Sequence, residues 1–265
     1  MYREALENMA ALSVAKSSYL KKSRLSYLVA SILAGVYVGF GIILIFTVGA
    51  PLADANAPVV NLVMGLSFGI ALTLVVFAGS ELFTGNNMCM AIGALEKKVT
   101  LNDLLNVWGW SWIGNLLGSI GLAVLAAFSG VMASKADFVA NVARAKMQAP
   151  ASELFFRGLL CNWLVCLAIW TSSRTKSDAA KCILIFWCLF AFIACGFEHS
   201  VANMTLLPLA LFLPHPETVT WLGVWKNLFV VSLGNIVGGA VCVGFLYWLS
   251  CRDNALRIYN GIRKE

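Results

Sequence analysis

Long apolar stretches separated by short polar loops dominate the chain. Three of them, residues 25–53, 55–80 and 104–134, contain no Lys, Arg, Asp or Glu. A bilayer's hydrocarbon core is about 30 Å thick and needs roughly 20 apolar residues per helix. The pattern therefore predicts an all-α integral membrane protein with six helices. We place these at 27–49, 60–94, 104–133, 152–172, 180–213 and 220–250.

The second and fifth segments are too long for one crossing, and each has an acidic residue near its middle. Glu81 is the one charged residue in 55–95, and Glu198 is the one acidic residue in 182–216. An ionisable group at bilayer depth is costly and usually faces a partner or a water-filled path. We therefore predict that both helices are broken, with these carboxylates accepting hydrogen bonds from backbone N–H groups freed at the breaks.

The two breaks have similar sequences, which indicates an internal repeat. Gly79-Ser80-Glu81 matches Gly196-Phe197-Glu198, an asparagine follows each glutamate by five residues, and Gly-Asn-x-x-Gly occurs at 114–118 and 234–238. Three helices per repeat is an odd number, so the second copy enters the membrane from the opposite side, as an inverted three-plus-three repeat. Asn86 and Asn203 are expected to cap the second half-helices, since asparagine is a preferred N-cap. The half-helix N-termini would then point their positive dipole ends at the midplane, where an anion can be stabilised.

The ends of the chain and the loops suggest an orientation. Residues 1–26 are expected to form an amphipathic cytoplasmic segment, or alternatively a solvated leader, residues 27–251 the pore domain, and residues 252–265 a cytoplasmic tail. Basic residues concentrate in both ends and in alternate loops, so both termini are expected in the cytoplasm of an inner (plasma) membrane protein. The loop between helices three and four breaks this rule with Lys135, Arg144 and Lys146. These residues either attract an anion or serve ordinary loop solvation.

Composition narrows the class further. The chain is 60% hydrophobic and 12% charged with a mean hydropathy of +0.82, which excludes an ordinary soluble domain. The net charge of +6 is spread over loops and ends, so no nucleic-acid partner is expected. The eight cysteines lack metal-type spacing and are expected to be small apolar residues without a metal or redox role. Glycines four residues apart, in particular Gly114/Gly118 and Gly234/Gly238, are expected to let helices pack closely.

His199 is the candidate for proton chemistry, because histidine changes its charge near neutral pH and this one sits at the second break. The alternative is a buried histidine that is simply hydrogen-bonded. His215, in a Pro-His-Pro turn, is expected at the surface.

The segments GSELFTGNNM (79–88), GLLCNWLVCLAIW (158–170) and GFEHSVANM (196–204) resemble the signature segments of the formate/nitrite transporter family. The similarity extends over about residues 25–250, and the sequence at 37–46 and 161–170 resembles the nitrite-channel branch more than the formate branch. The resemblance implies an aquaporin-like helical arrangement, a homopentamer with one pore per protomer, no cofactor and no enzymatic activity. It also implies a small anionic substrate, nitrite first, with formate or hydrosulfide as alternatives.

The resemblance also assigns residues. His199 matches the central pore histidine, Thr84 the threonine that faces it, and Asn162 and Lys146 polar residues near the path. The apolar constrictions match Phe68, Leu72, Leu82, Phe83, Val165 and Phe192.

A mechanism consistent with both lines of reasoning draws the anion past a dry constriction to His199 and Thr84. A protonated His199 pairs with the anion, or it donates a proton so that the neutral acid crosses, and Glu198 is expected to tune His199. Two other classes compete: a neutral-solute channel that shares the broken-helix plan, and a haem or metal redox subunit using His199, His215 and the cysteines.

Overall fold

The computed structural model describes residues 2–251, and every regular element in that range is helical. Five apolar helical segments in this range are long enough to cross a membrane. They are α2 (Arg24–Asp54), the run from α3 through α4 to the π-helix η1 (Val60–Gly79), α6 (Leu101–Phe128), α8 (Ala151–Ser172), and α11 continued by the π-helix η3 (Trp221–Cys251). The tail expected at 252–265 lies outside the described residues.

Two helical segments are interrupted where the sequence places Glu81 and Glu198. The segment comprising α3 (Val60–Ser67), α4 (Ile70–Leu74) and η1 (Val75–Gly79) ends before α5 (Phe83–Leu95) begins. Likewise α9 (Asp178–Ala194) ends before α10 (Ser200–Phe212) begins. The chain turns at Gly79 and Gly196, whose φ angles of +79° and +71° lie in the left-handed region that glycine adopts without a Cβ penalty.

Glycines bring the long helices into backbone contact. A Cβ on Gly118 of α6 would lie 2.0 Å from the carbonyl oxygen of Ile32 on α2. Gly238 lies in η3 (Val237–Phe245), which continues α11 (Trp221–Ile236). A Cβ on Gly238 would lie 2.2 Å from the carbonyl oxygen of Leu159 on α8. The packing role predicted for these glycines is confirmed, because no other residue fits at either contact.

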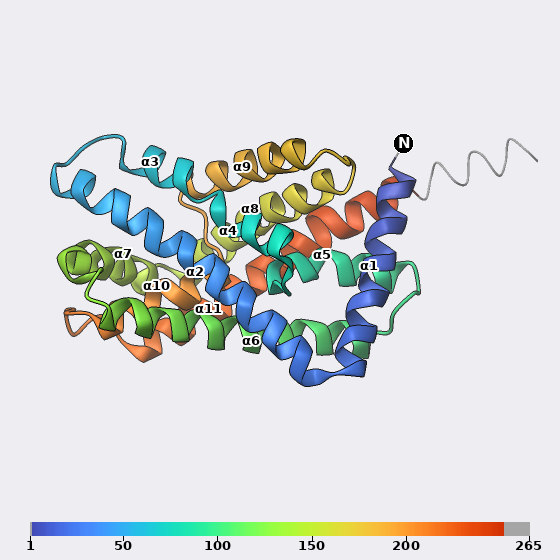
Figure 1. Ribbon diagram of the computed structural model, residues 1–265, viewed down its shortest axis with the longest axis horizontal. Coiled ribbons are helices and arrows are strands. Elements are labelled where there is room, and N and C mark those ends of the chain that lie inside the picture. The colour runs from blue at the N-terminus through green and yellow to red at the C-terminus, as the bar shows by residue number, and fades with distance from the viewer. Residues whose placement is uncertain (1, 252–265) are drawn as a thin grey trace, which may run out of the picture.

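Two further helices lie at the ends of the bundle. The helix expected in residues 1–26 is present as α1 (Arg3–Lys22), which crosses one end of the long helices and packs on α5 (Figure 1). Its Leu6, Met9 and Leu20 are buried. At the other end α7 (Ala136–Gln148), preceded by a 3₁₀ turn η2 (Ala133–Lys135), packs on α10 (Figure 1).

The presence of α7 corrects the sequence analysis, which treated the stretch after helix three as a loop. Val139, Ala143 and Met147 recur every four residues and are all buried, so the segment gains apolar burial as a helix.

The ring centroids of Tyr2 and Tyr247 are 5.8 Å apart, which places the beginning of α1 and the end of the last long helix at the same end of the bundle.

Candidate functional site

At the first break, Glu81 is held by side chains from three helices. Lys16 Nζ on α1 donates to both carboxylate oxygens at 2.8 and 2.7 Å, and Tyr27 Oη on α2 donates to Oε2 at 3.0 Å. Asn86 Nδ2 adds a bond of 3.2 Å from within α5. The expectation that Glu81 accepts from freed backbone N–H groups was wrong, and so was the N-cap role of Asn86, since Leu82 occupies that position.

The second break repeats this arrangement with different elements. Lys146 Nζ on α7 donates to Glu198 Oε1 at 2.6 Å, and Asn203 Nδ2 on α10 donates to Oε2 at 2.6 Å. Asn203 Nδ2 also donates to Asn227 Oδ1 on α11 at 2.8 Å. Glu198 is 2% exposed, and a buried charge is costly unless it is paired. Lys146 supplies the neutralising charge. The N-cap of α10 is His199 and not Asn203, which corrects the second N-cap prediction.

Two buried asparagines satisfy the backbone that the breaks expose. Asn115 Oδ1 accepts from the N–H of Phe83 at 2.9 Å, and Asn115 Nδ2 donates to the carbonyl of Glu81 at 2.9 Å. Asn235 accepts from the N–H of Ser200 at 2.9 Å and donates to the carbonyl of Glu198 at 3.0 Å. The sequence shows both asparagines only as parts of a repeated motif, although their similar distances from the break glutamates, 34 residues for Asn115 and 37 for Asn235, were the signal for this role.

The sequence also gives no signal for Lys16, because a lysine in an amphipathic segment fits an interfacial helix and nothing in the pattern links it to Glu81. Its counterpart Lys146 was identified through the family resemblance. Each is the one lysine that contacts a break glutamate among residues 2–251.

His199 has defined partners on both ring nitrogens. Nδ1 accepts from the backbone N–H of Ala202 at 3.1 Å, and Nε2 lies 3.0 Å from Thr84 Oγ1. A backbone N–H only donates, so Nδ1 carries no proton and the neutral ring holds its proton on Nε2. His199 therefore donates to the hydroxyl of Thr84 in this arrangement. The Phe192 ring stacks on the imidazole, with centroids 5.9 Å apart.

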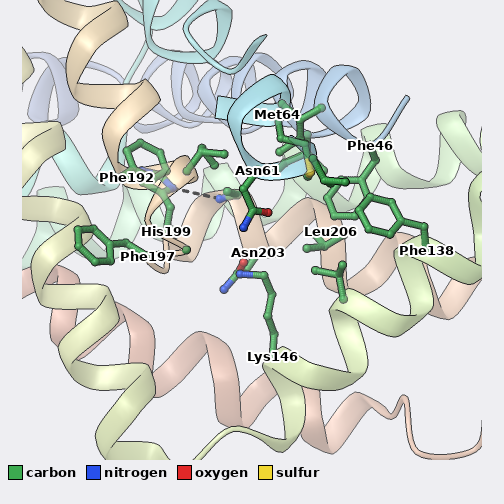
Figure 2. A pocket seen from close by; sticks show the side chains of 17 residues that line it. Phe46, Asn61, Met64, Phe138, Lys146, Phe192, Phe197, His199, Asn203 and Leu206 are labelled. Carbon is green, nitrogen blue, oxygen red and sulfur yellow. Dashed lines mark hydrogen bonds between the residues drawn. The ribbon is translucent and has the colours of Figure 1, made fainter. Parts of the chain in front are cut away.

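A cavity of about 190 Å³, which we call the His199 cavity, is lined by His199 and Phe192 among others (Figure 2). Its polar side chains are Asn61, Lys146, His199 and Asn203, and most of its other lining side chains are apolar. A second cavity of about 460 Å³, the Glu81 cavity, is lined by Lys16, Glu81, Leu82 and Asn86 among others. His199 borders the first cavity and Leu82 and Gly85, which flank Thr84 along the chain, border the second.

All six predicted constriction residues are buried. Phe68 and Phe192 form an edge-to-face pair with ring centroids 5.5 Å apart, next to His199. Phe192 lines the His199 cavity and Leu82 the Glu81 cavity. The exposed fractions of the six residues lie between 1% and 4%; the six are Phe68, Leu72, Leu82, Phe83, Val165 and Phe192. The structure thus places one of these apolar side chains at each cavity, while the role of all six in permeation stays a prediction.

Asn162 is fully buried on α8 behind Thr84. Its Nδ2 lies 3.1 Å from the carbonyl oxygen of Thr84, 3.1 Å from Asn87 Oδ1 and 2.6 Å from the carbonyl oxygen of Asn235. Asn162 therefore links the segment that carries Thr84 to the asparagine that secures the His199 break.

Comparison with known proteins identifies a family with which this chain shares its sequence pattern. The sequence profile described as "Formate/nitrite transporter" matches residues 3–249. The nitrite transporter NirC of Escherichia coli K12 is 46% identical over 250 residues, which cover 94% of this chain and 92% of that protein. The formate channel BtFdhC of Bacillus thuringiensis is 35% identical over 225 residues, covering 83% of this chain and 85% of that protein.

Two solved structures have the same fold. One, described as an FNT family ion channel, superposes with a TM-score of 0.90 at 44% identity, covering 94% of this chain and 99% of that one. A pentameric formate channel with formate bound superposes with a TM-score of 0.75 at 29% identity, covering 86% of this chain and 98% of that one.

Proposed function

Because the chain belongs to the formate/nitrite transporter family, we propose that it conducts a small monovalent anion across a membrane, with nitrite as the main substrate. The observation that carries the proposal is the buried His199–Thr84 pair: His199 lines one cavity, neighbours of Thr84 line the other, and each cavity has a lysine in its lining. We favour nitrite over formate as the proposed substrate because the nitrite transporter NirC is 46% identical to this chain, compared with 35% for the formate channel BtFdhC.

The proposed architecture is a six-crossing inverted repeat in which α9 and α10 together form one broken crossing. Equivalent hydrogen bonds support it: the N–H of Glu81 donates to Ala30 O at 3.1 Å, and the N–H of Glu198 donates to Arg157 O at 3.2 Å. Basic loops support a cytoplasmic location for both termini in an inner (plasma) membrane protein. Similarity to a pentameric channel supports a homopentamer.

Electrostatics at the two cavities favour an anion without trapping it. The N-termini of α5 and α10 lie at the breaks and carry positive partial charge. Lys16 and Lys146 add positive charge, but each is paired with a glutamate at 2.6–2.8 Å. A compensated lysine attracts an anion less strongly than a free one, so the anion can leave as well as enter.

His199 meets the anion as a neutral hydrogen-bond donor in the proposed mechanism. Proton uptake at Nδ1 would place two donors against each other and break the bond from Ala202 N–H that caps α10. Nε2–H is free to leave Thr84 Oγ1 and donate to the anion. Glu198 bonds to Lys146 and Asn203. In the proposed route the role of Glu198 is therefore to position Lys146, and it does not tune His199. This route is channel-like, and proton relay through His199 requires the helix cap to open.

Flux of nitrite, formate and hydrosulfide into proteoliposomes between about pH 5 and 8 tests these proposals. His199→Phe removes both the cap and the donor, whereas His199→Asn keeps an oxygen acceptor that can cap α10. The neutral-donor mechanism predicts that His199→Phe loses nitrite flux and that His199→Asn keeps part of it, because the asparagine amide N–H is also a neutral donor. It also predicts that the wild-type pH profile follows only the substrate's own ionisation. A wild-type pH dependence that disappears specifically in His199→Asn would instead support the relay.

The same assay separates the alternative functions. Faster formate or hydrosulfide flux than nitrite flux would reassign the substrate within the family. Absence of all anion flux, together with water or glycerol permeation in a swelling assay, would support the neutral-solute channel.

A further inference from the structure

One polar side chain in the His199 cavity has no hydrogen-bond partner. Lys146 and Asn203 bond to Glu198, and His199 bonds to Thr84. Asn61 lines the same cavity, and among residues 2–251 its amide has no bonding partner. An anion that enters the cavity therefore meets one side-chain donor that does not have to give up an existing protein bond.

The position of Asn61 suits a first contact with the anion. It is the second residue of α3 and is exposed, whereas Phe68, seven residues later on the same segment, is 2% exposed and pairs with Phe192 beside His199. Figure 2 shows the Asn61 side chain pointing toward Asn203 across the cavity. The amide thus lies before the apolar constriction, where an ion must begin to lose its water.

We propose that Asn61 is a specificity-determining residue that donates a hydrogen bond from Nδ2 to an oxygen of a small oxyanion in the His199 cavity. The inference rests on the proposed function and adds a recognition residue to it. Nitrite and formate present charged oxygen acceptors, for which an amide N–H is a good donor. Hydrosulfide presents only sulfur, which is a weaker acceptor. The bond therefore favours oxyanions over hydrosulfide.

The repeat suggests a substitution that tests this role. At the offset of 117 residues that relates Glu81 to Glu198, the residue equivalent to Asn61 is Asp178 at the start of α9. Asp178 is exposed and bonds to Lys181 at 2.8 Å. A carboxylate at position 61 would repel an entering anion, so Asn61→Asp, which introduces the residue of the equivalent position, is a sharp test.

The experiment measures initial rates against concentration for nitrite and hydrosulfide in proteoliposomes containing the full chain. Asn61→Leu is expected to raise KM for nitrite about 10-fold with Vmax within about twofold, and to change KM for hydrosulfide by less than about twofold. Asn61→Asp should raise KM for nitrite further, and Asn61→Gln, which restores the amide, should recover most of the loss. Asn141→Leu on the exposed face of α7, outside the cavity lining, is the matched control and should leave both KM values unchanged.

The outcomes separate this inference from the proposed function. If wild-type protein carries nitrite and Asn61→Leu leaves its KM unchanged, Asn61 is an ordinary solvated side chain and the inference is overturned. An equal rise in KM for nitrite and hydrosulfide also overturns it, because the residue then shapes the entrance without selecting oxygen. Absence of wild-type anion flux would overturn the proposed function itself.

Discussion

Replacing Gly118 by alanine tests how closely α2 and α6 are packed. The added Cβ would lie 2.0 Å from the carbonyl oxygen of Ile32 and 3.1 Å from its Cα. A carbon atom approaches a carbonyl oxygen to about 3.3 Å at closest, so the two helices must separate by roughly 1.3 Å. The obstacle is backbone, which cannot rotate away, so the strain is spread along the whole α2–α6 contact.

A gap of about 1 Å removes a quarter to a half of the dispersion attraction at each affected contact. Together with overpacking costs, we expect Gly118→Ala to destabilise the protein by about 3 kcal/mol. By the scaling for soluble domains of this size, that corresponds to a thermal midpoint lower by about 6–12 °C.

Gly121 on the same helix provides the control. A Cβ there meets nothing within 4 Å, so Gly121→Ala should be neutral or stabilising by about 0.5–1 kcal/mol through helix propensity. Thermal unfolding of the purified protein in detergent, followed by loss of the monodisperse elution peak, measures both variants. Equal midpoints for the two alanine variants would refute the close-packing argument.

Three further predictions concern the breaks. Asn235→Leu removes three hydrogen bonds, each contributing about 1 kcal/mol. Its thermal midpoint should fall well below that of the exposed-site control Asn141→Leu, and a similar midpoint would contradict the role of Asn235 in bonding the exposed backbone. Lys146→Met leaves the buried Glu198 without its cation and should lower the free energy of unfolding by about 3 kcal/mol. Adding Glu198→Gln should restore most of that loss, and a double variant as unstable as the single one would speak against the ion pair. Gly196→Ala should cost about 1–2 kcal/mol despite open space around it, because φ is +71°; unaltered unfolding would show that this φ angle is not required.

The sequence anticipated the membrane helices and the location of the breaks for simple physical reasons. Charge-free runs of more than 20 residues have few soluble alternatives, and Glu81 and Glu198 stand out because the apolar stretches around them lack other acidic residues. The His199–Thr84 pair was anticipated through the resemblance alone, since the two residues are 115 positions apart. No periodicity relates residues at that separation.

By itself, the sequence determined what each segment must avoid, namely unpaired charge and unsatisfied backbone in an apolar solvent. Only the tertiary structure decided how each need was met. Lys16 neutralises Glu81 from a separate helix, Asn115 and Asn235 bond the exposed backbone, and His199 caps α10 where an asparagine was expected. Those partners come from segments distant in the chain, and their choice depends on which helices pack together, which local propensity does not specify.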